Sequence, residues 1–354
     1  MANIFIKTFG CQSNYADSET IAGLLAEHGH ILVNSVEEAD FVITNSCGVK
    51  GKTENRITHF IREASLKRPT YVGGCLTSMV SVKKLCPDIA GVFDVNSILN
   101  IPSIIGKENV KAFSKIHEER VGLPRVRYNK EVAIINISQG CLNKCTFCGT
   151  KLARGTLFSY SPDKIVAEVK KAVLDGCTKI YLSSQDNGCY GYDIGTNLPY
   201  LLSEVVKIPG EFTIRVGMGN PQWIKKHIPE LIKIFSNEKI KKFLHVPVQS
   251  GSERIVSLMK RGHTVEDFLM IVRSFREAFP GITIATDIIV GYPDEKEEDF
   301  QATVELIREV RPEVVNLSKF ASRPKTFAST LTPLPSQEVK KRSRIISLLL
   351  NGSS

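Results

Sequence analysis

Residues 132–155 read VAIINISQGCLNKCTFCGTKLARG, and this stretch decides how the second half of the chain is interpreted. The apolar run VAIINIS predicts a strand, and Cys141, Cys145 and Cys148 follow it in a C-x3-C-x2-C spacing. In folds built from alternating strands and helices, functional groups gather at the carboxyl ends of the strands. The stretch therefore predicts a metal or cluster site at the end of this strand.

The alternation of strand and helix continues from this stretch to the end of the chain. The predicted strands are VAIINIS, KIYLSS, FTIRVG, FLHVPVQ, ITIATDIIVG and VVNLSKF. Helical patterns follow them, for example at residues 162–176, 295–310 and 336–350. Six successive β/α units predict either an open parallel sheet or a partial barrel.

The first 105 or so residues show a similar alternation. Predicted strands cover residues 3–9, 40–45 and 70–74, and predicted helices cover residues 16–29, 52–65 and, more briefly, 101–106. For the first helix, Asp17 or Ser18 is the expected N-cap and Gly29 the expected end. We therefore expect a second parallel sheet with crossover helices.

A charged segment separates these two parts of the chain. Residues 107–130 carry seven Lys or Arg against three acids and fit neither pattern, which favours a linker with the boundary near Pro124. We expect an N-terminal domain at residues 1–124, a second domain at residues 125–335 and a C-terminal helix at residues 336–354.

The composition of the chain indicates which partners and which cellular location to expect. A net charge of +9 and a pI near 9.0 favour a polyanion such as nucleic acid as a partner. No apolar run approaches the roughly 18 residues that span a bilayer, and the start does not resemble a signal peptide, so a cytoplasmic protein without membrane contact is expected. Cys86, Cys177 and Cys189 stand alone and are expected in the core.

The number of clustered cysteines limits the kind of metal site. Structural zinc is usually closed by four ligands, and no fourth Cys or His lies near Cys141, Cys145 and Cys148 in the sequence. Three thiolates suit an iron–sulfur cluster with one open iron, which could bind a substrate. Zinc or a purely structural cluster are the alternatives.

A second set of cysteines lies in the first part of the chain. Cys11, Cys47 and Cys75 each stand at or just beyond the end of a predicted strand. Adjacent carboxyl ends meet at one edge of a parallel sheet, so the three thiols could converge. Three unrelated core cysteines are the alternative.

The sequence motifs around these cysteines resemble those of a known family. TFGCQSN, NSCGVKGKTEN and GGCL, followed by SQGCLNKCTFC and ARG, are similar to the radical S-adenosylmethionine (SAM) methylthiotransferases. The resemblance implies an N-terminal doubly wound parallel-sheet domain followed by a radical SAM (β/α)6 partial TIM barrel. It also implies two 4Fe-4S clusters, one held by Cys141, Cys145 and Cys148 that binds and cleaves SAM, and one held by Cys11, Cys47 and Cys75.

Two further segments favour one branch of this family. KLARGTLFSY and QDNGCYGYD look most like the archaeal and eukaryotic branch, which inserts a methylthio group at C2 of N6-threonylcarbamoyladenosine at position 37 of tRNA, beside the anticodon. The alternatives are an enzyme for isopentenyladenosine tRNA, an enzyme for a ribosomal-protein aspartate, and an iron–sulfur or zinc protein that only binds RNA. A monomer is expected, and the sequence does not indicate the sulfur or electron donor.

Polar residues at the other strand ends are candidates for SAM contacts. They are Ser184, Gln185, Asp186, Arg215, Gln249 and Ser250. Arg154 is a candidate phosphate or SAM contact, and the group Arg323, Lys325, Lys340, Lys341, Arg342 and Arg344 could contact tRNA phosphates. Most relatives continue into a small RNA-binding TRAM domain, which this sequence is expected to lack.

Overall fold

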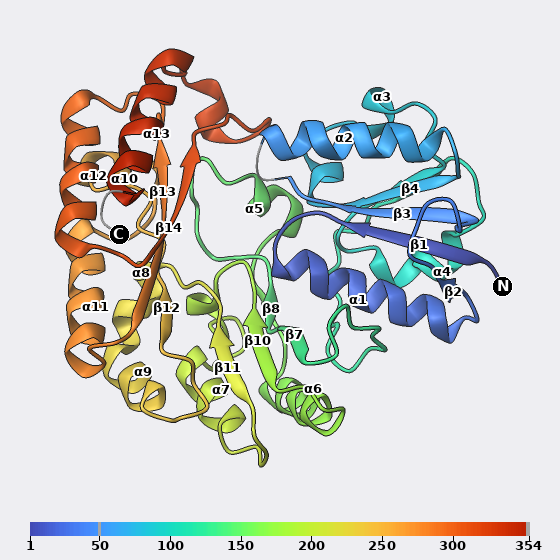
Figure 1. The fold of residues 1–354 in the computed structure, drawn as a ribbon, viewed down its shortest axis with the longest axis horizontal. Coiled ribbons are helices and arrows are strands. Elements are labelled where there is room, and N and C mark those ends of the chain that lie inside the picture. The colour runs from blue at the N-terminus through green and yellow to red at the C-terminus, as the bar shows by residue number, and fades with distance from the viewer. Residues whose placement is uncertain (49–50, 352–354) are drawn as a thin grey trace. The chain divides into compact units, whose positions relative to one another are not determined.

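The computed structural model describes residues 1–48 and 51–351, without the side chains of residues 51–53 (Figure 1). The chain divides into two compact units, one of Met1–Cys141 with Gly149–Gln185 and the other of Leu142–Cys148 with Asp186–Ser354. Residues 352–354 of the expected C-terminal helix lie outside the described part. The domain boundary expected at residue 124 stays a prediction.

A six-stranded parallel sheet forms the centre of the first unit. Its order is β2-β1-β3-β4-β5-β6, and its strands are Asn3–Thr8 (β1), Ile31–Leu32 (β2), Phe41–Ser46 (β3), Thr70–Gly74 (β4), Gly91–Phe93 (β5) and Val110–Ala112 (β6). The chain moves outward from β1 to β2 and then returns past β1 to β3, so the strand order reverses between β1 and β3. Ligands of doubly wound sheets bind at such a reversal, outside the carboxyl ends of the strands.

Helices cover both faces of this sheet, as Figure 1 shows for α1 (Gln12–Glu27) on one side and α2 (Gly51–Ser65) on the other. Ile21 and Leu25 of α1 pack with Ile4 and Ile43 in one apolar cluster. On the other face, Ile57 and Ile61 of α2 pack with Phe9, Val72 and Leu76. Shorter helices complete the region, at Val82–Leu85 (α3) and Ile101–Ile104 (α4).

Two predictions for this region need correction, the start of the first helix and the charged linker. Helix α1 begins at Gln12 with Cys11 as its N-cap, four residues before the expected start at residue 16. Asp17 does not cap the helix but lies inside it, buried in ion pairs. The segment expected as a charged linker contributes β6 to the sheet. It also contributes Arg120, whose side chain is buried against Asp17.

The rest of the first unit contains β7 (Val132–Asn136) and β10 (Lys179–Ser183), which pair in parallel. A short antiparallel pair, β8 (Ser138–Gln139) with β9 (Phe158–Ser159), flanks the segment that carries Cys141. Helices α5 (Gly149–Arg154) and α6 (Pro162–Leu174) follow. Gly140, with φ of 73°, adopts the left-handed conformation, and a Cβ there would lie 2.0 Å from the Thr156 carbonyl oxygen, so the turn into the cysteine loop requires glycine.

The second unit continues the β/α alternation predicted from the sequence. Its strands are Thr213–Val216 (β11), Phe243–His245 (β12), Thr283–Val290 (β13) and Val314–Lys319 (β14), and the last three form a parallel sheet. Its helices are Leu198–Val205 (α7), Pro221–Ile224 (α8), Ile228–Phe235 (α9), Glu253–Leu258 (α10), Val265–Ala278 (α11), Glu297–Val310 (α12) and Ser336–Asn351 (α13). All six strands predicted between residues 132 and 320 are present. Across the described residues, no helix combines the length and the apolar character needed to cross a membrane.

Candidate functional site

Cys11, Cys47 and Cys75 lie at the carboxyl ends of three neighbouring strands. Strand β1 pairs with β3 up to Thr8 and Asn45, and β3 pairs with β4 up to Ser46 and Gly74. Cys47 and Cys75 each follow a residue of that last pair directly. The three cysteines therefore stand at one edge of the sheet, beside the reversal between β1 and β3.

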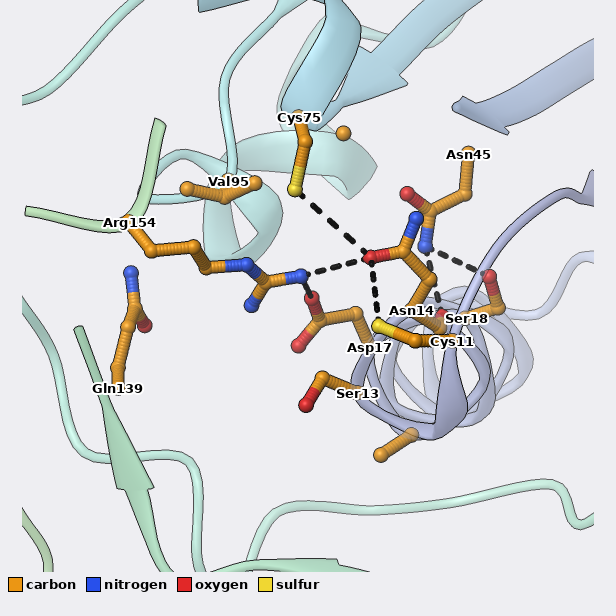
Figure 2. A network of polar contacts seen from close by, with 12 residues as sticks. Cys11, Ser13, Asn14, Asp17, Ser18, Asn45, Cys75, Val95, Gln139 and Arg154 are labelled. Atoms are coloured by element: carbon orange, nitrogen blue, oxygen red, sulfur yellow. Dashed lines mark hydrogen bonds and ion pairs between the residues drawn. The ribbon is translucent and has the colours of Figure 1, made fainter. Parts of the chain in front are cut away.

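Asn14, in the first turns of α1, connects two of these cysteines. Its Oδ1 atom lies 4.0 Å from Cys11 Sγ and 3.9 Å from Cys75 Sγ (Figure 2). Its amide nitrogen donates to the Phe9 and Ser46 carbonyls, which fixes the orientation of the side chain. Two thiols within 4.0 Å of a single oxygen atom can serve as ligands of one group.

Glycine makes room around this edge of the sheet. A Cβ on Gly10 would lie 3.0 Å from Cys47 Cβ, and a Cβ on Gly48 would lie 3.3 Å from the carbonyl carbon of Cys75. Gly74, just before Cys75, has a φ of 92°. The thiolate chemistry and the close backbone approach fit an iron–sulfur cluster held by these cysteines.

Arg154 reaches this group of residues from α5. The sequence suggested a phosphate or SAM contact, but the side chain is 2% exposed and its Nη2 lies 2.7 Å from Asp17 Oδ2 and 2.9 Å from Asn14 Oδ1 (Figure 2). Burial raises the pKa of the Cys75 thiol, and the neighbouring Arg154 guanidinium opposes that shift. No local sequence signal links Asp17 to an arginine 137 positions away, so this pairing was missed.

The C-x3-C-x2-C cysteines are divided between the units, with Cys141 in the first and Cys145 and Cys148 in the second. In the first unit the Cys141 N–H donates to the Gly155 carbonyl, which lies 3.3 Å away. In the second unit the Cys148 N–H donates to the Cys145 carbonyl, and Arg261 Nη1 lies 3.3 Å from Cys145 Sγ. Three cysteines at this spacing match the donors of a 4Fe-4S cluster, and their joint binding of one cluster stays a prediction.

Asp186, one of the predicted SAM contacts, accepts several hydrogen bonds. Its Oδ1 accepts from the N–H groups of Gly188 and Asn220, at 3.0 and 2.9 Å, and its Oδ2 accepts from the side chain of Asn143. Trp223 donates its indole N–H to Asn143 Oδ1, 2.9 Å away. Burial raises the pKa of Asp186, although these donors oppose the shift. Asp186 thus holds Asn143, which lies between Cys141 and Cys145 in the sequence.

Gln185 and Ser250 are bonded within their own units. Gln185 Oε1 accepts from the Gly140 N–H at 2.7 Å, and its Nε2 lies 3.3 Å from Ser13 Oγ. Ser250 is fully buried, and its hydroxyl bonds to Thr303 Oγ1 at 3.1 Å. The Gln185 bond positions the backbone at Gly140, and the Ser250 bond joins the side chain to Thr303 of α12. Direct contact of either side chain with SAM stays a prediction.

Of the three remaining candidates, Gln249 is buried, and Arg215 and Ser184 are partly buried. Gln249, with φ of 75°, forms an isolated parallel bridge with Ile288, and the guanidinium of Arg215 lies 4.5 Å from the centre of the Phe243 ring. Arg342, predicted in a phosphate-binding group, is instead buried and paired with Glu295 at 2.7 Å and Glu338 at 2.9 Å. That part of the prediction is wrong because the side chain points toward Glu295, in the loop before α12, and toward Glu338 one turn earlier in α13.

Comparisons with known proteins match both parts of the chain. Residues 135–307 match the radical SAM superfamily, and residues 3–93 match uncharacterized protein family UPF0004. A protein of Pyrococcus horikoshii named probable threonylcarbamoyladenosine tRNA methylthiotransferase is 44% identical over 354 residues, which cover 98% of this chain and 83% of the relative. The chain belongs to the threonylcarbamoyladenosine tRNA methylthiotransferase family.

Other members of the family extend the match to eukaryotes. The human threonylcarbamoyladenosine tRNA methylthiotransferase is 37% identical over 365 residues, which cover 99% of this chain and 63% of the human protein.

A solved structure matches the fold of the chain. The radical SAM methyltransferase TsrM from Kitasatospora setae, solved with cobalamin and a 4Fe-4S cluster, aligns with a TM-score of 0.67 at 15% identity over 92% of this chain and 76% of TsrM. That likeness confirms the predicted fold, a parallel-sheet domain followed by a radical SAM (β/α)6 partial barrel. Membership of the radical SAM superfamily implies SAM and a 4Fe-4S cluster.

Proposed function

We propose that this protein inserts a methylthio group at C2 of N6-threonylcarbamoyladenosine at position 37, in the anticodon loop of tRNA. Relatives that carry this activity in their names match nearly the whole chain. The observation that carries the proposal is the convergence of Cys11 and Cys75 on one atom of Asn14, because a second thiolate site is what sulfur insertion adds to SAM cleavage. Because the substrate is tRNA, we place the activity in the cytoplasm.

Six of the nine cysteines form two ligand sets in this proposal. We assign Cys141, Cys145 and Cys148 to the cluster that binds SAM, and Cys11, Cys47 and Cys75 to a second 4Fe-4S cluster. When bound, these groups supply a carbon-centred radical and the sulfur that is transferred. Asp186, through Asn143, orients the loop between the first two SAM-site cysteines, and Gln185 orients the backbone at Gly140.

Mass analysis of nucleosides tests the substrate. We expect tRNA from cells expressing the chain to contain 2-methylthio-N6-threonylcarbamoyladenosine, and tRNA from cells lacking it to contain only the unmethylthiolated nucleoside. Methylthiolation of isopentenyladenosine, or of an aspartate in a ribosomal-protein peptide, would identify a different substrate. Binding of tRNA without release of 5′-deoxyadenosine from SAM would show a binding protein instead.

A pair of buried cysteines provides a matched control. Cys75 and Cys86 are both buried in the first unit, but only Cys75 lies at the strand edge beside Asn14. We expect Cys75→Ser to abolish the modified nucleoside and Cys86→Ser to retain it. Equal loss in both variants would point to unfolding and would remove the support for a second thiolate site.

A further inference from the structure

Arg154 places a fixed positive charge beside Cys11 and Cys75. Figure 2 shows its guanidinium pointing toward α1, where Asn14 Oδ1 accepts a hydrogen bond from Nη2 and lies within 4.0 Å of both sulfur atoms. A second bond joins the same Nη2 to Asp17 Oδ2, 2.7 Å away. The two bonds fix the position of the charge before any ligand binds.

The charges around Asp17 do not balance. Its Oδ1 lies 2.8 Å from Arg120 Nη1 while its Oδ2 pairs with Arg154, and all three side chains are 2% exposed. Two guanidinium groups and one carboxylate carry a net charge of +1. Asp94, another buried carboxylate of this unit, accepts from the Ser97 hydroxyl and from the Asn96 and Ser114 N–H groups. A buried excess of positive charge is unfavourable unless an anion compensates it.

We propose that Arg154, held by Asp17 and Asn14, is the positioning residue that compensates the negative charge of the group bound by Cys11, Cys47 and Cys75. Three thiolate ligands supply the anion that the Asp17–Arg120–Arg154 triad lacks. A nearby fixed cation stabilises the more negative of two states, so Arg154 favours the reduced state of a bound cluster. This inference rests on the second thiolate site of the proposed function.

A purely structural ion pair would behave differently. Arg120 and Arg154 bind the same carboxylate and are equally buried, but only Arg154 also contacts Asn14 beside the cysteines. Loss of either arginine removes one buried charge and one ion pair. Arg120→Gln is therefore the matched control for Arg154→Gln.

The test uses the full chain with Cys141, Cys145 and Cys148 all changed to alanine, so that only the second site can bind iron and sulfide. After anaerobic reconstitution, iron and sulfide are counted and the midpoint potential is measured by redox titration with electron paramagnetic resonance. We expect Arg154→Gln to shift the one-electron equilibrium about tenfold toward the oxidised state, which is about 59 mV. We expect Arg154→Lys and Arg120→Gln to shift it less.

The possible outcomes separate the two proposals. A parent protein without iron overturns both the second site and this inference. A parent that binds a cluster whose potential does not respond to Arg154→Gln, or responds equally to Arg120→Gln, overturns this inference alone. If circular dichroism shows that Arg154→Gln does not fold, the test uses Arg154→Lys, which keeps the positive charge. A midpoint potential near that of the parent then supports the inference, and a tenfold shift of the equilibrium overturns it.

Discussion

The two cysteine sites each have a buried arginine, but the two arginines are held differently. Arg154 is paired with Asp17 and bonded to Asn14, both on α1 of the first unit. Arg261 of the second unit, 6% exposed, contacts Cys145 Sγ and donates to the Pro247 carbonyl at 2.9 Å. Within residues 1–48 and 51–351, no carboxylate forms an ion pair with Arg261, and its Nε has no hydrogen-bond partner. An ion pair with a carboxylate thus helps to hold Arg154, whereas Arg261 is held by a carbonyl and a cysteine sulfur.

The largest expected effect separates the chemistry of the two sites. We expect Cys75→Ser to stop formation of the methylthio nucleoside while 5′-deoxyadenosine release continues, and Cys145→Ser to stop both. The reason is that each substitution removes one thiolate ligand from only one site. Mass spectrometry of both products in the same reaction measures these effects. Loss of SAM cleavage in Cys75→Ser would show that the two cysteine sites do not have separate functions.

Removal of the carboxylate is expected to have the next largest effect. Asp17→Asn leaves two buried guanidinium groups without their anion, which costs about 3–5 kcal/mol of folding stability. Urea unfolding of the cluster-free protein, followed by circular dichroism, measures the loss. A cost below about 1 kcal/mol would show that water or another group already compensates the charge.

The first unit also contains a carboxyl group that should make its stability depend on pH. Burial raises the pKa of Glu19 to about 7, although the Tyr128 N–H and nearby arginines oppose the shift. Between pH 4.5 and about 7 the native side chain keeps a proton that the unfolded chain has lost, so stability falls as pH rises through this window. At 1.36 kcal/mol per pKa unit, the loss is about 3 kcal/mol.

Glu19→Gln should remove this dependence, because an uncharged amide keeps the acceptor for Tyr128 without the ionisation. The measurement compares urea midpoints of the parent and the variant at pH 5 and pH 8. The variant is expected to be more stable than the parent at pH 8 and similar to it at pH 5. A parent whose stability rises between these pH values by more than that of the variant would contradict the raised pKa.

The smallest effect is expected at Arg261. Among the described residues, Arg261 forms no direct ion pair, and its charge acts on Asp186 and Asp287 only at longer range. Arg261→Met replaces it with an apolar side chain of similar length and should cost about 1 kcal/mol, which is less than the cost of Asp17→Asn. Urea unfolding followed by circular dichroism measures the change in stability, and the change caused by Asp17→Asn is the reference. If Arg261→Met were as destabilising as Asp17→Asn, the contrast between the two arginines would disappear.

Much of the fold could be predicted because its signals are local. The six strands from residue 132 onward, helix α2 and the termination of α1 near Gly29 follow from apolar periodicity and from turn residues. The arrangement of Cys11, Cys47 and Cys75 at one sheet edge was also predictable, since carboxyl ends of parallel strands lie together. The short strands β2, β5 and β6 were missed because two or three residues give too little pattern.

The sequence by itself determined which residues could bind metal, because cysteine spacing and strand ends are visible in the order of residues. Only the tertiary structure decided the charges around them. Asp17 was expected to cap a helix, Arg154 to contact a ligand and Arg120 to lie in a linker, yet the three form one buried triad. Whether a charged side chain is buried, and beside which partner, depends on packing between segments more than a hundred residues apart, and no local pattern encodes it.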